Sequence, residues 1–174
     1  MRAQDEAAIV ACIPGLRRYA RGLLGGTDLA DDLVQDTLER AWARFSFWQQ
    51  RSDVRAWMFG IMHNRFVDVL RARRSRPEDV ANDAVPEVAV RPRQTDGLEL
   101  RDLDRLLQRL PAEQREVLLL IVTEDLTYRQ VADALAIPIG TVMSRLSRAR
   151  DRLRKDLQEP GVPFAADARL QRVK

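Results

Sequence analysis

The stretch from residue 127 to residue 155 constrains the fold of this chain most strongly, because it holds two short helical patterns separated by a break. Thr127 and Gln130 have the spacing of a capping box, which satisfies free backbone N–H groups at the start of a helix. Pro138 ends the first pattern, since proline disfavours a helical conformation in the residue before it. The second pattern has an apolar seam made of Val142, Leu146, Ala149 and Leu153. Two short helices joined by a tight turn predict a helix-turn-helix.

The other face of the second predicted helix carries side chains that suit DNA. In a major groove, short hydroxyl groups bond to phosphates or base edges, and arginine binds guanine. More arginines follow along the same helix, enough to neutralise several phosphates. An ordinary helix pair with a solvated basic face is the alternative, but the turn and the hydroxyl-rich face favour DNA binding. The residues on this face are Thr141, Met143, Ser144, Ser147 and Arg148.

Composition restricts the class of protein. The chain has 174 residues, of which 45% are hydrophobic and 32% are charged, as expected for a soluble protein with a buried core. No apolar run is long enough to cross a bilayer, and the N-terminus lacks the apolar block of a signal peptide. Cys12 is the single cysteine, so an internal disulfide and a cysteine metal cluster are excluded. We expect a cytoplasmic protein with no metal, no cofactor and no membrane insertion.

Charge is sorted along the chain, although the net charge is only +3. Residues 28–39 contain five acids and no base. Acids in the first turn of a helix complement its dipole, but five exceed that need and indicate a docking face for a protein partner. Residues 51–76 contain seven arginines against two acids. Arginine suits phosphate and base recognition, although a GC-rich genome also raises its number, so position carries more weight than count.

Five further stretches have apolar residues at helical spacing. Pro14 interrupts the first stretch, and because proline fits best at the first position of a helix, we expect a short helix before it and a new helix from it. Trp42 is expected to face the core, and Ser52 or Asp53 can cap the third helix. Trp57 and Phe59 fit the core better than a role in DNA melting. The expected helices cover residues 14–24, 28–45, about 53–74, 98–109 and 112–123.

Residues 75–97 lack hydrophobic periodicity and contain three prolines among acidic residues, which indicates a linker. A structureless loop of this length does not belong inside one compact domain. The three helices before it are long enough to close a small core by themselves. We therefore predict an all-α protein with two small helical domains joined by a flexible acidic linker. The expected boundaries are a helix bundle over 1–75, the linker over 76–97, a helix-turn-helix domain over 98–158 and a flexible tail over 159–174.

Three segments, at residues 31–42, 55–64 and 140–150, resemble bacterial RNA polymerase sigma factors of the sigma-70 family. With the linker between them they cover nearly the whole chain, and the two-domain form is similar to the extracytoplasmic-function (ECF) group. The resemblance implies an alternative sigma factor. Such a protein binds core RNA polymerase, recognises the minus-ten and minus-thirty-five promoter elements and initiates transcription of a specific regulon under the control of an anti-sigma factor.

The resemblance also implies site residues. The acidic helix would dock on the clamp of the polymerase's largest subunit through Asp31, Asp32, Gln35, Asp36 and Glu39. The third helix would bind the minus-ten element, with loop 46–52 holding an extruded base, through Arg55, Asn64, Arg65, Asp68, Arg71 and Arg74. The helix-turn-helix domain would contact the flap of the second subunit and read the minus-thirty-five element through Arg129, Thr141, Met143, Ser144, Arg145, Ser147 and Arg148.

Two positions depart from the family pattern. Ala136 occupies a turn position where glycine is common, which predicts a strained or differently shaped turn. Met143 stands where several relatives carry a basic residue, and methionine cannot donate a hydrogen bond there. The promoter sequence therefore does not transfer from the family.

Two other functions compete with this interpretation. A stand-alone helix-turn-helix transcriptional regulator would leave the acidic 28–39 segment and the basic 51–76 segment unexplained. A nuclease would need a catalytic cluster, but His63 is the only histidine and no paired carboxylates accompany it in a catalytic spacing. We therefore expect no enzymatic activity.

Overall fold

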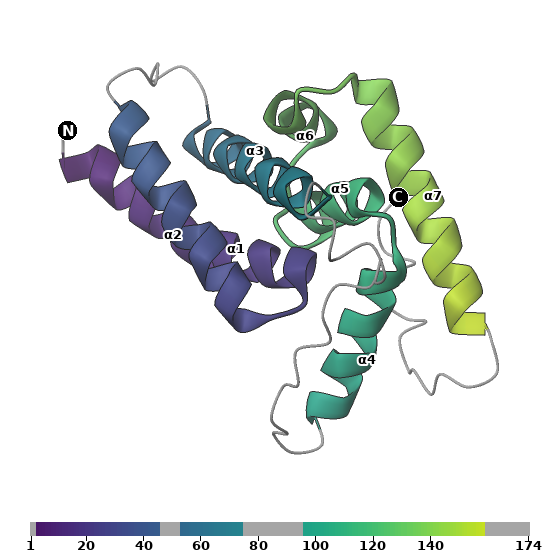
Figure 1. The fold of residues 1–174 in the computed structure, drawn as a ribbon. Coiled ribbons are helices and arrows are strands. Elements are labelled where there is room, and N and C mark those ends of the chain that lie inside the picture. Colours follow the sequence, from purple (N-terminus) through teal and green to yellow (C-terminus); the bar gives the residue numbers. More distant parts are fainter. Residues whose placement is uncertain (1–2, 46–52, 75–95, 159–174) are drawn as a thin grey trace.

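The computed structural model describes residues 3–45, 53–74 and 96–158, and within these ranges the chain forms seven α-helices and no strand (Figure 1). The all-α prediction is confirmed. Loop 46–52, nearly all of the predicted linker and the predicted tail lie outside the described residues. The helices are α1 (Ala3–Leu24), α2 (Thr27–Arg44), α3 (Val54–Arg74), α4 (Asp96–Arg109), α5 (Ala112–Val122), α6 (Tyr128–Leu135) and α7 (Ile139–Gln158).

Helices α1, α2 and α3 form the first lobe. The expected break at Pro14 is wrong, because α1 continues through this residue without interruption. Proline removes one intrahelical hydrogen bond, here to the carbonyl of Val10. Both Val10 and Pro14 are exposed, so water can reach the carbonyl that loses its partner. The expectation for Trp42 is also wrong, since this side chain is 45% exposed near the end of α2.

The start of α3 follows the sequence prediction. An Oδ atom of Asp53 accepts a hydrogen bond from the backbone N–H of Arg55 at 2.9 Å, as an N-terminal cap does. Phe59 is completely buried, and Trp57 is partly buried with its ring packed edge-on against Phe45 at 6.3 Å. Both aromatic residues therefore belong to the packing of the first lobe.

Helices α4 to α7 form the second lobe, in which α5 supports the helix-turn-helix of α6 and α7. The capping box of Thr127 and Gln130 is confirmed by both of its hydrogen bonds. Ala136 ends α6 in the left-handed conformation, with φ of 53°. This is the position where the sequence predicted strain, because a side chain makes that conformation costly. The predicted apolar seam of α7, from Val142 to Leu153, is buried.

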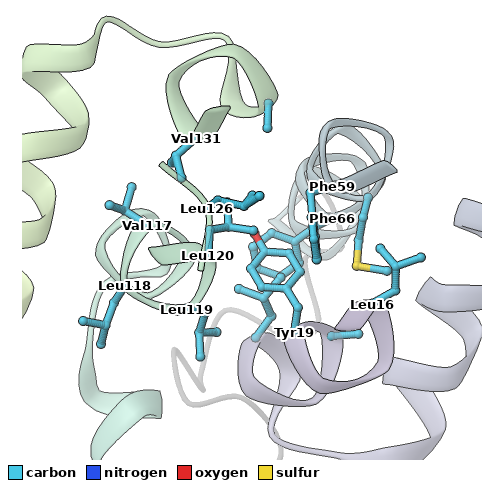
Figure 2. Packing of buried hydrophobic residues seen from close by; sticks show 14 of the residues in the cluster. Leu16, Tyr19, Phe59, Phe66, Val117, Leu118, Leu119, Leu120, Leu126 and Val131 are labelled. Atoms are coloured by element: carbon cyan, nitrogen blue, oxygen red, sulfur yellow. The ribbon is translucent and has the colours of Figure 1, made fainter. Parts of the chain in front are cut away.

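The two lobes pack directly on each other rather than standing apart. Helix α6 lies against α3, and α4 and α5 lie against α1 (Figure 1). Tyr19 and Phe59 of the first lobe form an edge-to-face pair, with ring centres 5.3 Å apart, and face Leu120 and Leu126 of the second lobe (Figure 2). Instead of two separate cores, the buried apolar residues form one cluster that runs through both lobes.

Candidate functional site

The acidic face of α2 is open to a partner. Asp31, Asp32, Gln35 and Glu39 are exposed, while the leucines of the same helix face α1 and α3. Gln35 donates a hydrogen bond to Glu39 at 3.2 Å, along the helix surface. Asp36 differs from the others, because it is half-buried and forms an ion pair with Arg65 of α3. Four of the five predicted docking residues therefore present their polar groups to solvent.

A hollow of ≈ 360 Å³ lies beside this face, between α2 and α3. Its apolar walls come from leucines of α1 and α2 together with Phe66 and Val69 of α3. Its polar lining consists of Asp32, Gln35, Asp36 and Arg65. An apolar surface with an acidic edge suits a basic, amphipathic helical partner, since it combines burial of apolar area with opposite charge.

The residues predicted to bind the minus-ten element divide into two groups. Asn64, Asp68 and Arg71 are exposed along α3, as their spacing predicted. The Nδ2 of Asn64 donates to the carbonyl of Gly60 at 3.0 Å, and Asp68 forms an ion pair with Arg40 of α2 at 3.5 Å. These three side chains form a polar strip with both signs of charge. The side chain of Arg74 lies outside the described residues.

Arg55 and Arg65 form the second group, and each of them pairs with a carboxylate of this same chain. Arg65 holds Asp36, as described above. Arg55 donates a hydrogen bond to Glu124 at 3.0 Å, across to the second lobe. A DNA phosphate would therefore have to compete with these carboxylates for the two arginines. Spacing alone could not separate them from the exposed group.

The face of α7 that the sequence predicted to read DNA is exposed at most positions. Met143, Ser144, Ser147 and Arg148 are exposed, and we call them the open face of α7. Thr141 is half-buried and accepts a hydrogen bond from Ser144 through its carbonyl, at 3.0 Å. Arg129 is exposed on α6. The first half of this helix thus exposes hydroxyl groups, one arginine and a methionine side by side.

Arg145 lies outside the open face. Its guanidinium pairs with Glu113 of α5 at 2.7 Å, and only 22% of its side chain is exposed. In a helix with 3.6 residues per turn, position 145 lies beside the buried seam rather than opposite it. Arg145 therefore links α7 to α5. The residues around it in the sequence did not predict this contact.

Sequence reasoning missed a set of polar groups where the lobes meet, which we call the lobe boundary. It consists of Arg18, Tyr19, Arg55 and His63 of the first lobe and Arg115, Glu116 and Glu124 of the second. Glu124 is completely buried and accepts hydrogen bonds from Arg18 at 2.9 and 3.0 Å as well as from Arg55. Glu116 contacts Nδ1 of His63 at 2.7 Å and accepts from the hydroxyl of Tyr19 at 3.4 Å.

Arg115 joins the ends of two helices at this boundary. It donates to the carbonyl of Leu23 at the end of α1, at 2.6 Å, and to the carbonyls of Leu107, Gln108 and Leu110 near the end of α4. A guanidinium at a helix C-terminus satisfies carbonyl groups that have no partner within the helix. Burial lowers the pKa of Arg115 to about 10. Burial, reinforced by the neighbouring Glu116 carboxylate, raises the pKa of Tyr19 well above its usual value.

The described helices were also compared with what membrane spanning and metal binding require. None of the helices in this part of the chain is long and apolar enough to cross a membrane. Within the described ranges, no three His, Cys, Asp or Glu side chains gather closely enough to hold a metal ion. His63 is engaged with Glu116, and Cys12 is buried, which raises the pKa of its thiol.

Comparisons with known proteins agree with this arrangement. Residues 9–63 match the family described as the Sigma2 domain of PhyR, and residues 100–153 match the family described as Sigma-70, region 4. The ECF RNA polymerase sigma factor EcfG of Rhodopseudomonas palustris is 39% identical over 145 residues, which cover 83% of this chain and 80% of that protein. The ECF RNA polymerase sigma factor SigC of Mycobacterium tuberculosis is 34% identical over 154 residues, covering 88% and 83%.

A solved structure extends the likeness to three dimensions. The sigma factor RpoE from Bartonella quintana, crystallised in complex with the anti-sigma factor NepR, is similar with a TM-score of 0.78 and 36% identity. The match covers 88% of this chain and 96% of that chain, so it includes helices of both lobes.

Proposed function

This chain belongs to the ECF RNA polymerase sigma factors, and on that premise we propose how its surfaces divide the work of promoter recognition. As a sigma factor it acts with core RNA polymerase to initiate transcription at promoters, without an enzymatic activity of its own. The supporting observation is that an acidic face on α2 and a hydroxyl- and arginine-bearing face on α7 are both exposed, on different lobes. A polymerase and a promoter can therefore be bound at the same time.

The acidic face is the surface that docks on the clamp of the largest polymerase subunit. Asp31, Asp32, Gln35 and Glu39 offer exposed oxygens, and the adjoining hollow between α2 and α3 offers apolar area. Acidic groups at such a surface accelerate association with a basic partner and make it sensitive to salt. Asp36 acts indirectly, because it holds Arg65 in the wall of that hollow until Arg65 is released to the promoter.

The two lobes read different promoter elements. Residues 1–75 form the domain that binds the minus-ten element, through Asn64, Asp68, Arg71 and Arg74 together with Arg55 and Arg65 once these are released from their carboxylates. Residues 98–158 form the domain that reads the minus-thirty-five element, with the open face of α7 in the major groove. Arg129 contacts the DNA backbone beside it, and the same domain contacts the flap of the second subunit. The linker over 76–97 connects the domains, and the tail follows residue 158.

An anti-sigma factor controls this chain. This part of the proposal is supported by the likeness to RpoE of Bartonella quintana, which was crystallised with the anti-sigma factor NepR. The likeness extends over helices of both lobes, so a partner of that kind would meet a similar surface here. The proposed role includes a cytoplasmic location, where core polymerase and promoter DNA are found.

Transcription in vitro tests the function directly. The purified chain, mixed with core polymerase and a library of genomic fragments, is expected to produce transcripts from a limited set of start sites that core polymerase alone does not use. The Asp31→Asn/Asp32→Asn variant is expected to require more core polymerase, because two exposed charges of the docking face are lost. Glu6→Gln, which removes an exposed acid on α1, is the matched control. Specific, tight promoter binding by the free chain, with no response to core polymerase, would instead identify a stand-alone regulator.

A further inference from the structure

We propose that Met143 is a specificity-determining residue, which selects a thymine in the promoter by covering the methyl group of that base with its own side chain. The inference rests on the proposed role of α7 in reading the minus-thirty-five element. It adds the chemical group that this one side chain recognises and the base that carries this group.

Met143 is an exposed apolar side chain within a polar surface. It is 49% exposed, although the other residues of the open face of α7 are two serines and an arginine. It is also the fifth residue of α7, which begins at Ile139. The N-terminal residues of a recognition helix are the ones that contact base edges in the major groove. The thioether of Met143 therefore lies where a base edge is read.

A hollow of ≈ 290 Å³ lies between α6 and α7, with Met143 in its wall. The other apolar side chains of this wall are the half-buried Tyr128 and the buried Leu146. The polar residues of the wall are Ser147, Arg150, Asp151 and Arg154. Two arginines outnumber one aspartate, so the wall carries net positive charge. Apolar area beside positive charge suits the methyl edge of a base that lies next to phosphates.

The hydrogen-bond donors of the two residues after Met143 are engaged within the protein. The hydroxyl of Ser144 donates to the carbonyl of Thr141 at 3.0 Å, and the guanidinium of Arg145 pairs with Glu113 at 2.7 Å. The methionine side chain itself has no donor. This part of the helix therefore recognises a base through apolar contact at Met143 rather than through a donated hydrogen bond.

Thymine is the base that offers an apolar group to the major groove. Its C5-methyl group points into that groove, whereas the edges of the other three bases present hydrogen-bond donors and acceptors. A methionine over this methyl group removes two apolar surfaces from water, which stabilises the complex. Over another base, the same side chain would separate a donor or acceptor from water without replacing its hydrogen bond. Met143 therefore favours thymine and disfavours the other bases.

Selection of promoters by the polymerase complex tests this assignment. Core polymerase with the full chain is mixed with promoter fragments whose minus-thirty-five element is randomised, and the bound fragments are sequenced. The wild type is expected to enrich thymine at one position of one strand. Met143→Ala is expected to lose that preference and to keep the others. Met143→Lys is expected to enrich guanine at the same base pair, because an ammonium group donates to guanine N7 and O6.

Base analogues isolate the methyl group itself. Deoxyuridine in place of the selected thymine removes only the methyl group, and it is expected to weaken wild-type binding about fourfold, equivalent to about 0.8 kcal/mol. At the same position, 5-methylcytosine is expected to bind better than cytosine by a similar factor. Met143→Ala is expected to bind the thymine and deoxyuridine promoters equally. Deoxyuridine at a thymine between the two promoter elements is the DNA control and is expected to change nothing.

Val122→Ala is the matched protein control, because Val122 is an apolar side chain of the same lobe that is 44% exposed on α5. It is expected to select the wild-type sequence. Methionine, alanine and lysine are all good helix formers, so circular dichroism is expected to show the same helix content for all Met143 variants.

Three results would overturn the assignment of Met143. In the first, the wild type and Met143→Ala select the same bases. In the second, the wild type binds the thymine and deoxyuridine promoters equally. In the third, Met143→Ala weakens binding to core polymerase without DNA, which would make Met143 a contact with protein. If the wild-type complex enriches promoter sequences but no thymine depends on Met143, only the assignment fails. If it enriches no sequence at all, the proposed function fails as well.

Discussion

The lobe boundary and the open face of α7 are both rich in polar and charged groups, but the protein uses them in opposite ways. At the boundary, the carboxylates of Glu116 and Glu124 are buried and are paired with side chains of the first lobe, as Glu124 is with Arg18 and Arg55. On the open face, Ser147 and Arg148 reach into solvent. The difference shows that an arginine in a basic helix is not by itself a DNA contact, because its role depends on the carboxylates that the fold brings near it.

Arg115 offers the strongest test of this contrast, because it is the most buried arginine at the boundary and donates hydrogen bonds to several backbone carbonyls. Arg115→Ala is expected to lower the free energy of unfolding by about 3–5 kcal/mol, since several buried carbonyl oxygens lose their donor. Urea denaturation measures the loss. Arg109→Ala, at an exposed position at the end of α4, is the control and is expected to change the value by less than about 0.5 kcal/mol. Equal losses of unfolding free energy for the two variants would contradict the difference between the lobe boundary and exposed positions.

Arg148 and Arg145 allow a comparison within one helix. Arg148→Ala is expected to weaken promoter binding of the polymerase complex by about 1–3 kcal/mol, because an exposed arginine of the open face of α7, which we propose contacts DNA, is lost. Arg145→Ala is expected to have a clearly smaller effect, since Glu113 already holds that guanidinium. Competition binding to promoter DNA at a fixed salt concentration measures both. An equal or larger loss for Arg145→Ala would show that its ion pair opens on DNA.

Tyr19 gives a smaller effect, visible at alkaline pH. Its pKa is raised because burial and the Glu116 carboxylate disfavour the phenolate. The folded pKa therefore exceeds the unfolded value of about 10. The corresponding stability is fully present below the unfolded pKa and is lost as the pH rises toward the folded pKa.

Tyr19→Phe keeps the ring against Phe59 and removes this ionisation. At neutral pH it is expected to cost about 0.5–1 kcal/mol, for the long hydrogen bond to Glu116. Above about pH 10 the variant is expected to lose stability less steeply than the wild type. Urea denaturation between pH 8 and pH 11 measures both curves, and their difference isolates Tyr19. Parallel curves would show that the boundary admits water around this hydroxyl.

Much of the helical layout followed from local patterns. The capping box at Thr127, the seam of α7 and the cap at Asp53 each depend on residues within a few positions of one another. Pro14 and Trp42 were predicted wrongly for one reason. Whether a helix tolerates a proline, or buries a tryptophan, depends on which side faces solvent, and only packing against other helices fixes that side.

The sequence by itself determined that this chain is helical, that acidic and basic segments occupy different helices, and that the second lobe holds a helix-turn-helix, because periodicity and capping act over a few residues. Only the tertiary structure decided which charged side chains face solvent and which pair with other side chains. Arg18 and Arg55 lie 106 and 69 residues from Glu124 along the chain, and only packing of the helices brings their side chains together. The local sequence determines the position of a charge on its helix, whereas the fold determines which groups that charge contacts.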